Sequence, residues 1–170
     1  MKAPASRLRI PALVIGTGIA GLTTALGLAK RGVKVLLLTK ADEPAECNTR
    51  YAQGGIIYFG KKDSPGALVR DVLDAGAGLC NAEAVRFLAQ EGPRVVEEVL
   101  IGDAGVPFSR TREGDLDFTR EGAHSVARIV HSADATGKAI ELALLARVKR
   151  ERDVKVWTGA TAVDLITARH

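Results

Sequence analysis

The sequence is poor in the residues that several classes of protein need. Phe, Trp and Tyr make up only 4% of it, so aromatic platforms that stack nucleic-acid bases are not expected. Its two cysteines, Cys47 and Cys80, lack the spacing of a metal or redox motif, which favours free thiols in a reducing compartment. No apolar run is long enough to cross a membrane. We therefore expect a cytoplasmic protein without a membrane partner.

Basic residues exceed acidic ones only modestly, and they are spread along the chain. The formal net charge is +4, with local clusters only at residues 61–62 and 147–152. This is a mild bias toward anionic ligands and lacks the concentrated basic footprint of a nucleic-acid-binding protein. With 46% hydrophobic and 26% charged residues, a chain of 170 residues can bury the core of a globular domain. No nucleic-acid partner is expected.

One glycine-rich stretch lies between a predicted strand and a predicted helix. Residues 11–15 are apolar and predict a buried strand, and a helix is expected from Gly21 to about Arg31. Gly16, Gly18 and Gly21 have the spacing G-x-G-x-x-G. In that motif the first glycine permits a tight turn, the second lets the backbone approach a pyrophosphate, and the third lets helix and strand pack closely. Because the helix N-terminus favours anions, this context predicts dinucleotide binding.

The end of the second predicted strand departs from the usual NAD pattern. Residues 33–38 predict a buried strand that completes a βαβ unit with a parallel pair. In the usual fingerprint an acidic residue at its end binds a ribose hydroxyl. Here Thr39 and Lys40 stand instead, which counts against an ordinary NAD site. Thr39 can still bond ribose, and Lys40 can meet a phosphate.

The remaining pattern predicts further helices and strands around that unit. Pro93 should kink or divide the second of the helices that follow. The last helix should cover a parallel sheet in order 3-2-1. The fold class is therefore α/β, a Rossmann-like domain with helical and β-hairpin insertions. The predicted elements are helices at 63–77, where Asp63-Ser64-Pro65 supplies a cap candidate, at 81–100, capped by Asn81, and at 138–150, a hairpin at 108–120, a strand at 154–157 and the start of another at 162–167.

Two polar segments lie outside these elements. Residues 48–55 carry many hydrogen-bonding groups and two adjacent glycines, as loops that face a ligand do, although a solvated connection is the alternative. Residues 121–134 form an irregular segment with two of the three histidines. His131 and Asp134 either fix this loop and cap the next helix or take part in function. No ligand spacing converges as a metal site requires, so none is predicted.

Three segments together resemble the L-aspartate oxidase family, which belongs to the succinate dehydrogenase and fumarate reductase group of flavoproteins. They are residues 14–22, residues 48–56 (N-T-R-Y-A-Q-G-G-I) and residues 119–137, which include T-R-E-G-A-H-S and D-A-T-G. The resemblance implies FAD rather than NAD. It implies oxidation of L-aspartate to iminoaspartate, with a hydride passing from Cα to flavin N5 and electrons then to oxygen or fumarate. Quinolinate synthase is implied as a partner by the pathway alone.

The resemblance also assigns residues. It places Glu121 at the substrate, where its carboxylate suits the ammonium group, with His124 and Ser125 as supporting candidates. Asn48 stands where relatives with covalent flavin have histidine, so FAD should be bound non-covalently. The implied cofactor-binding residues are Gly16, Thr17, Gly18, Ile19, Ala20, Gly21, Thr39, Lys40, Asn48, Thr49, Arg50, Tyr51, Ala52, Gln53, Gly54, Gly55 and the backbone near Ala162.

The family has parts that the sequence does not match. A capping domain, a second FAD-binding stretch, and the arginines and histidines that bind the substrate carboxylates lie beyond position 170 in the family. We therefore expect residues 1–170 to be the N-terminal part of the FAD-binding domain. The alternatives are a soluble flavoprotein similar to fumarate reductase and an inactive fragment that binds FAD or another nucleotide.

Overall fold

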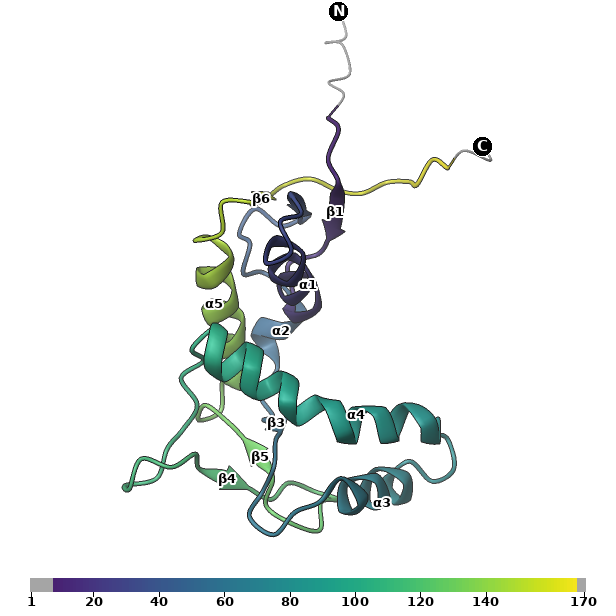
Figure 1. The fold of residues 1–170 in the computed structure, drawn as a ribbon, viewed down its shortest axis with the longest axis vertical. Coiled ribbons are helices and arrows are strands. Elements are labelled where there is room, and N and C mark those ends of the chain that lie inside the picture. The colour runs from purple at the N-terminus through teal and green to yellow at the C-terminus, as the bar shows by residue number, and fades with distance from the viewer. Residues whose placement is uncertain (1–7, 168–170) are drawn as a thin grey trace, which may run out of the picture. The chain divides into compact units, whose positions relative to one another are not determined.

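The chain divides into two compact units. The computed structural model describes residues 8–167. The first unit combines residues 1–47 with residues 145–170, and the second comprises residues 48–144. Figure 1 shows both units, with most of their elements labelled. The helix α5 (Thr136–Val148) begins in the second unit and ends in the first.

The first unit contains the predicted parallel sheet. Its strands are β1 (Ala12–Ile15), β2 (Val35–Leu38) and β6 (Val154–Trp157), in the order β1-β2-β6. Both pairs are parallel, so the predicted order 3-2-1 is confirmed. All four residues of β2 are buried because the strand has a neighbour on each side, whereas β1 and β6 alternate as edge strands do.

The helix α1 (Ile19–Ala29) connects β1 to β2 and packs against the sheet. Its buried residues are Leu22, Ala25, Leu26 and Ala29, which recur at the three- and four-residue spacing of one helix face. The helix begins two residues before the predicted Gly21 and ends two before Arg31. The last turn of α5 buries Val148 before the chain enters β6, as expected of a crossover helix.

Helices dominate the second unit. The helix α3 (Pro65–Ala75) begins after Ser64, whose Oγ accepts a hydrogen bond from the Ala67 N–H at 3.2 Å. The helix α4 (Ala82–Val95) begins after Asn81, whose Oδ1 accepts from two backbone N–H groups. These caps are the ones that the sequence predicts. The two helices pack together as a helical hairpin (Figure 1).

Pro93 lies inside α4 without ending it. The helix continues to Val95 and then widens into a π-helical stretch, η1 (Val96–Asp103). Proline removes one backbone N–H from the helical ladder, and a change of pitch just after it accommodates that loss. The helical region therefore runs three residues beyond the predicted end at about residue 100.

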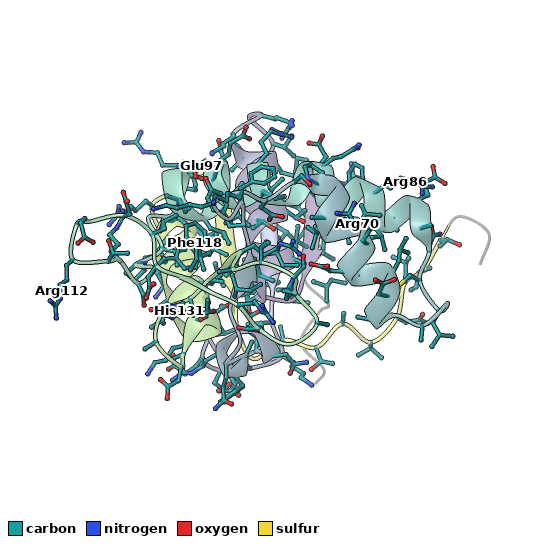
Figure 2. All side chains as sticks on the ribbon, turned by 90° about the horizontal axis from the view of Figure 1, so that it is seen from below. Arg70, Arg86, Glu97, Arg112, Phe118 and His131 are labelled. Atoms are coloured by element: carbon teal, nitrogen blue, oxygen red, sulfur yellow. The ribbon has the colours of Figure 1, made fainter. Side chains whose placement is uncertain are left out.

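A small antiparallel sheet accompanies the helices, with strands β3 (Ile56–Ile57), β5 (Ile129–Val130) and β4 (Phe118–Thr119) in the order β3-β5-β4. The predicted hairpin at 108–120 is right in part. Arg110 and Leu116 form an antiparallel bridge around its turn, and Arg112 at the tip points away from the ribbon (Figure 2). The strand that follows, however, pairs with β5 rather than within the hairpin.

Three further expectations need correction. Residues 48–51 form one helical turn, α2 (Asn48–Tyr51), in a segment expected to be irregular. The expected irregular segment 121–134 contains β5. Residues 162–167 do not form a strand in the part of the chain described, because no neighbouring strand pairs with them. Their apolar side chains are exposed instead, at 91% for Val163, 77% for Leu165 and 83% for Ile166.

Among the residues that the structure describes, none of the helices is both long and apolar enough to cross a membrane.

Candidate functional site

The glycine loop of the first unit has the geometry that its spacing predicts. Gly16 has a φ of +103°, a conformation that favours glycine, and its N–H donates to the Leu38 carbonyl oxygen at 2.7 Å. A Cβ atom at Gly21 would lie 1.9 Å from the Gly16 carbonyl oxygen. Only glycine at both positions therefore permits this turn with α1 packed so closely against it.

The start of α1 is open to an anion. Gly18 is its N-cap residue, with φ −68° and ψ 179°, and within the described residues no side chain caps this end. Thr17 beside it is only 2% exposed, yet its Oγ1 has no hydrogen-bond partner among the residues described. A buried hydroxyl left without a partner costs about 1–3 kcal/mol. A phosphate group at this helix end would supply an acceptor for it.

Thr39 and Lys40 follow β2 at the carboxyl edge of the sheet. The Thr39 N–H donates to the Trp157 carbonyl oxygen at 2.8 Å, and the Thr39 carbonyl oxygen accepts from the Ala160 N–H at 3.0 Å. Its buried side-chain Oγ1 accepts from the Ala41 N–H at 3.3 Å, whereas Lys40 is exposed. The chain toward Ala162 thus leaves the sheet beside Thr39. Ala162 itself lies in the exposed segment after β6.

In the second unit, the two polar segments 48–55 and 121–134 meet at Gly54 and Gly55. The Gly55 N–H donates to Glu121 Oε1 at 3.1 Å, and a Cβ atom at Gly54 would lie 3.7 Å from Glu121 Oε2. A Cβ atom at Gly55 would lie 2.3 Å from Ile129 Cγ2. Glycine is therefore required at position 55, where the chain passes close to β5 while its N–H binds a carboxylate 66 residues away in the sequence.

The start of α5 packs on the same polar segment. The Gly137 N–H donates to the Ala52 carbonyl oxygen at 2.9 Å. A Cβ atom at Gly137 would lie 2.0 Å from the Thr49 carbonyl oxygen, so no larger residue fits. The structure therefore brings residues of the second and third resembling segments into direct contact.

The other predicted residues of this segment face outward. The side chains of Asn48, Tyr51, Ala52 and Gln53 are exposed, and Arg50 is half-buried. His131 Nε2 lies 3.6 Å from Asp117 Oδ2, which is too long for a hydrogen bond, and it is buried without a hydrogen-bond partner among the described residues. Across residues 8–167, no three His, Cys, Asp or Glu side chains gather closely enough to hold a metal ion.

Comparison with known proteins assigns this chain to a family. The family model described as an FAD binding domain matches residues 12–170. The chain belongs to the FAD binding domain family. FAD is therefore the cofactor, as expected, rather than NAD. The positive φ of Gly16, the lack of room at Gly21 and the unpartnered Thr17 hydroxyl all fit its pyrophosphate.

The chain is also similar to curated L-aspartate oxidases. It is 45% identical over 157 residues to the chloroplastic enzyme of Arabidopsis thaliana. The aligned region covers 92% of this chain and 24% of that protein. The chain is 44% identical over 155 residues to the enzyme of Halobacterium salinarum, covering 91% of this chain and 30% of that protein. The chain thus spans less than a third of the length of these relatives.

Solved structures of two flavoproteins have a similar fold. A quinol fumarate reductase of E. coli matches with a TM-score of 0.83 at 23% identity, over 89% of this chain and 26% of that one. The Sdh1 complex of Mycobacterium smegmatis matches with a TM-score of 0.79 at 29% identity, over 87% of this chain and 27% of that one. The α/β fold class expected from the sequence is therefore confirmed.

Sequence reasoning missed a buried ionic cluster beside Glu121. Arg128 is fully buried and donates through Nε and Nη2 to the two carboxylate oxygens of Asp63, at 2.8 and 2.9 Å. Its Nη1 donates to Asp71 Oδ2 at 2.6 Å. The acids precede Arg128 by 65 and 57 residues, so no local spacing could have revealed the cluster.

Asp71 binds both Arg128 and Ser125 through one carboxylate oxygen. Its Oδ2 accepts from both the backbone N–H and the hydroxyl of Ser125, each at 2.8 Å. The backbone hydrogen bond of Ser125, together with its hydroxyl and the Arg128 guanidinium, lowers the pKa of Asp71 to about 2. Asp71 is therefore ionised at neutral pH.

Proposed function

We propose that the complete gene product containing residues 1–170 is an FAD-dependent L-aspartate oxidase that forms iminoaspartate. The observation that carries the proposal is the position of the Glu121 carboxylate against Gly54 and Gly55 in a chain of the FAD binding domain family. The 45% identity to an L-aspartate oxidase over 92% of this chain supports aspartate as the substrate.

Glu121 is proposed to bind the substrate ammonium group. L-aspartate carries two carboxylates and one ammonium group, so a site for it needs one acceptor of a positive charge. One oxygen of Glu121 accepts from the Gly55 N–H, which orients the carboxylate, and the other remains an acceptor beside Gly54. A carboxylate held in this way makes a charge-assisted hydrogen bond to an ammonium group, and such bonds are among the stronger ones.

The residues of the glycine loop are proposed to hold the pyrophosphate of FAD through the start of α1 and the Thr17 hydroxyl. Lys40 and the backbone near Ala162 are proposed to lie toward the adenosine, and residues 48–55 beside the flavin. Bound FAD supplies the hydride acceptor, and the protein supplies binding and orientation. Asn48 has an amide in place of a nucleophilic ring nitrogen, so we propose that FAD is held non-covalently.

Oxygen or fumarate as the electron acceptor, quinolinate synthase as a partner and a cytoplasmic location also belong to this proposal. They rest on the resemblance to L-aspartate oxidases and on the chemistry of the product.

The proposal is tested by anaerobic mixing of the complete gene product, loaded with FAD, with L-aspartate. We expect the visible flavin absorbance to bleach with L-aspartate and to persist with succinate. Bleaching with succinate and not with L-aspartate would instead identify a flavoprotein related to fumarate reductase. Failure to retain FAD after reconstitution would overturn the proposal and favour an inactive fragment.

A further inference from the structure

We propose that Arg128, Asp71 and Ser125 act as a clamp, anchored on the buried Arg128 guanidinium, that positions the Glu121 carboxylate for the substrate. This inference rests on the proposed function, because it assigns positioning residues to the same site. The clamp itself does not touch the substrate. It fixes the far end of the short loop that carries Glu121, while the Gly55 N–H fixes the near end.

The loop between Glu121 and Ser125 is a tight turn. The His124 N–H donates to the Glu121 carbonyl oxygen at 3.3 Å, which closes the turn. Ala123 inside it has a φ of +65°, a left-handed conformation that residues with a Cβ atom rarely adopt. Such a conformation persists only where surrounding contacts hold it. The two bonds from Ser125 to Asp71 supply those contacts at the end of the turn.

Arg128 connects the turn to the start of α3. Its planar guanidinium binds Asp63 through two nitrogens, and Asp63 Oδ1 also accepts from the Ser64 N–H at 2.7 Å, at the N-cap of α3. Asp71 lies further along α3. Because a guanidinium has its donors at fixed angles, one arginine sets the positions of both carboxylates at once. The position of the turn is therefore fixed relative to α3, a regular helix.

The same guanidinium also contacts a residue of the turn directly, His124. Arg128 Nη1 lies 3.1 Å from His124 Nδ1. Since the guanidinium can only donate, His124 must accept through Nδ1, and a neutral imidazole then carries its hydrogen on Nε2. Two consecutive residues of the turn, His124 and Ser125, are therefore held by one buried cluster. Buried ion pairs contribute little net stability but impose geometry, which matches the role of a clamp.

Asp71→Asn is the informative change. Arg128 stays paired with Asp63, so the substitution leaves no uncompensated buried charge, while the charged acceptor of the two Ser125 bonds is lost. Asp74→Asn is the matched control, since Asp74 lies on the same helix and is exposed. Both variants lose one negative charge. Ser125→Ala is a second, milder probe that removes only the hydroxyl donor.

The experiment is a double-mutant cycle in the complete, FAD-loaded gene product, with aspartate-driven flavin reduction as the readout. We expect Asp71→Asn to lower the reduction rate about tenfold, since small misplacements of a binding group cost this much or more. FAD affinity and the rate of the Asp74→Asn control should stay within twofold of the unmodified protein. Ser125→Ala should lower the rate by a smaller factor in the same direction.

The decisive result is the combination with Glu121→Gln. If the clamp acts through Glu121, Asp71→Asn should cost nothing further in the Glu121→Gln background. The proposal would be overturned if the rate losses of Asp71→Asn and Glu121→Gln multiplied in the double variant. It would also be overturned if Asp71→Asn or Ser125→Ala alone left the reduction rate unchanged. If Asp71→Asn does not fold, Ser125→Ala in both backgrounds decides by the same rule. A failure of the proposed function is distinct, because then L-aspartate would not bleach even the unmodified protein.

Discussion

The carbonyl oxygen of Gly16 lies where a side chain at position 21 would begin: a Cβ atom at Gly21 would be 1.9 Å from it. No rotation of a side chain relieves this overlap, because it involves a backbone atom and the first atom of any side chain. The glycine loop and the start of α1 can therefore keep their geometry only while position 21 stays glycine.

Gly21→Ala should consequently destabilise the protein and weaken FAD binding at least tenfold. Overpacking of this kind costs about 1–3 kcal/mol in the free energy of unfolding. Gly27→Ala in the same helix is the control, since a Cβ atom there meets Arg31 only at an ordinary distance of 3.6 Å. Gly27→Ala should raise the free energy of unfolding by about 0.5–1 kcal/mol, because alanine is the better helix former. Denaturant unfolding and flavin fluorescence titration measure both effects.

Gly137→Ala should disturb the second unit in the same way. A Cβ atom at Gly137 would lie 2.0 Å from the Thr49 carbonyl oxygen, so α2 must move or the start of α5 must shift. We expect a loss of about 1–3 kcal/mol in unfolding free energy. Gly66→Ala in α3 provides the comparison, because its nearest contact would be 3.8 Å. Equal stabilities of the two variants would contradict the packing described here.

The lowered pKa of Asp71 predicts that the stability of the folded protein decreases at acidic pH. Its pKa is lowered from 3.8 to about 2 in the folded protein. A lowered pKa means that the folded state favours the ionised form, so this contribution to stability is fully present above the unfolded pKa. It is lost as pH falls from about 4 toward about 2.

Melting temperatures of the unmodified protein and of Asp71→Asn check this prediction. Their difference should be constant between pH 5 and 7 and should shrink below about pH 4. A difference that persists unchanged at pH 2, or one that already declines near pH 6, would show that Asp71 is not the ionised partner of Ser125 and Arg128.

The parts of this fold that sequence reasoning foresaw are those specified by neighbouring residues. The Ser64 and Asn81 caps bind backbone N–H groups two or three positions away, and the glycine loop depends on six consecutive residues. The strand order followed as well, because a βαβ unit allows few parallel arrangements.

The parts that it missed depend on distant residues. Arg128 finds Asp63 and Asp71 across more than fifty positions, and Phe118 pairs with Val130 in a different segment from its own hairpin. Residues 162–167 have a strand-like pattern without a paired neighbour in the described structure, and a strand forms only with a partner. Among the predicted site residues, the contacts of Glu121 with Gly55 and of Ala52 with Gly137 also depend on long-range packing.

Non-covalent FAD is a separate prediction that rests on Asn48. An asparagine amide does not form the bond to flavin that a histidine nitrogen forms. Precipitating the FAD-loaded protein with acid should therefore release the yellow colour into the supernatant. Flavin that stays with the pellet through repeated washing would show a covalent link and would refute this assignment.

Glu121 is proposed to bind the ammonium group of L-aspartate beside FAD. The most direct test of this role is the rate of anaerobic flavin reduction by L-aspartate in the complete gene product and in Glu121→Gln, at equal FAD content. Losing a charge-assisted bond, worth about 1.5–3 kcal/mol, should slow reduction at low aspartate concentration at least tenfold while FAD stays bound. Equal rates in the two proteins would contradict the account.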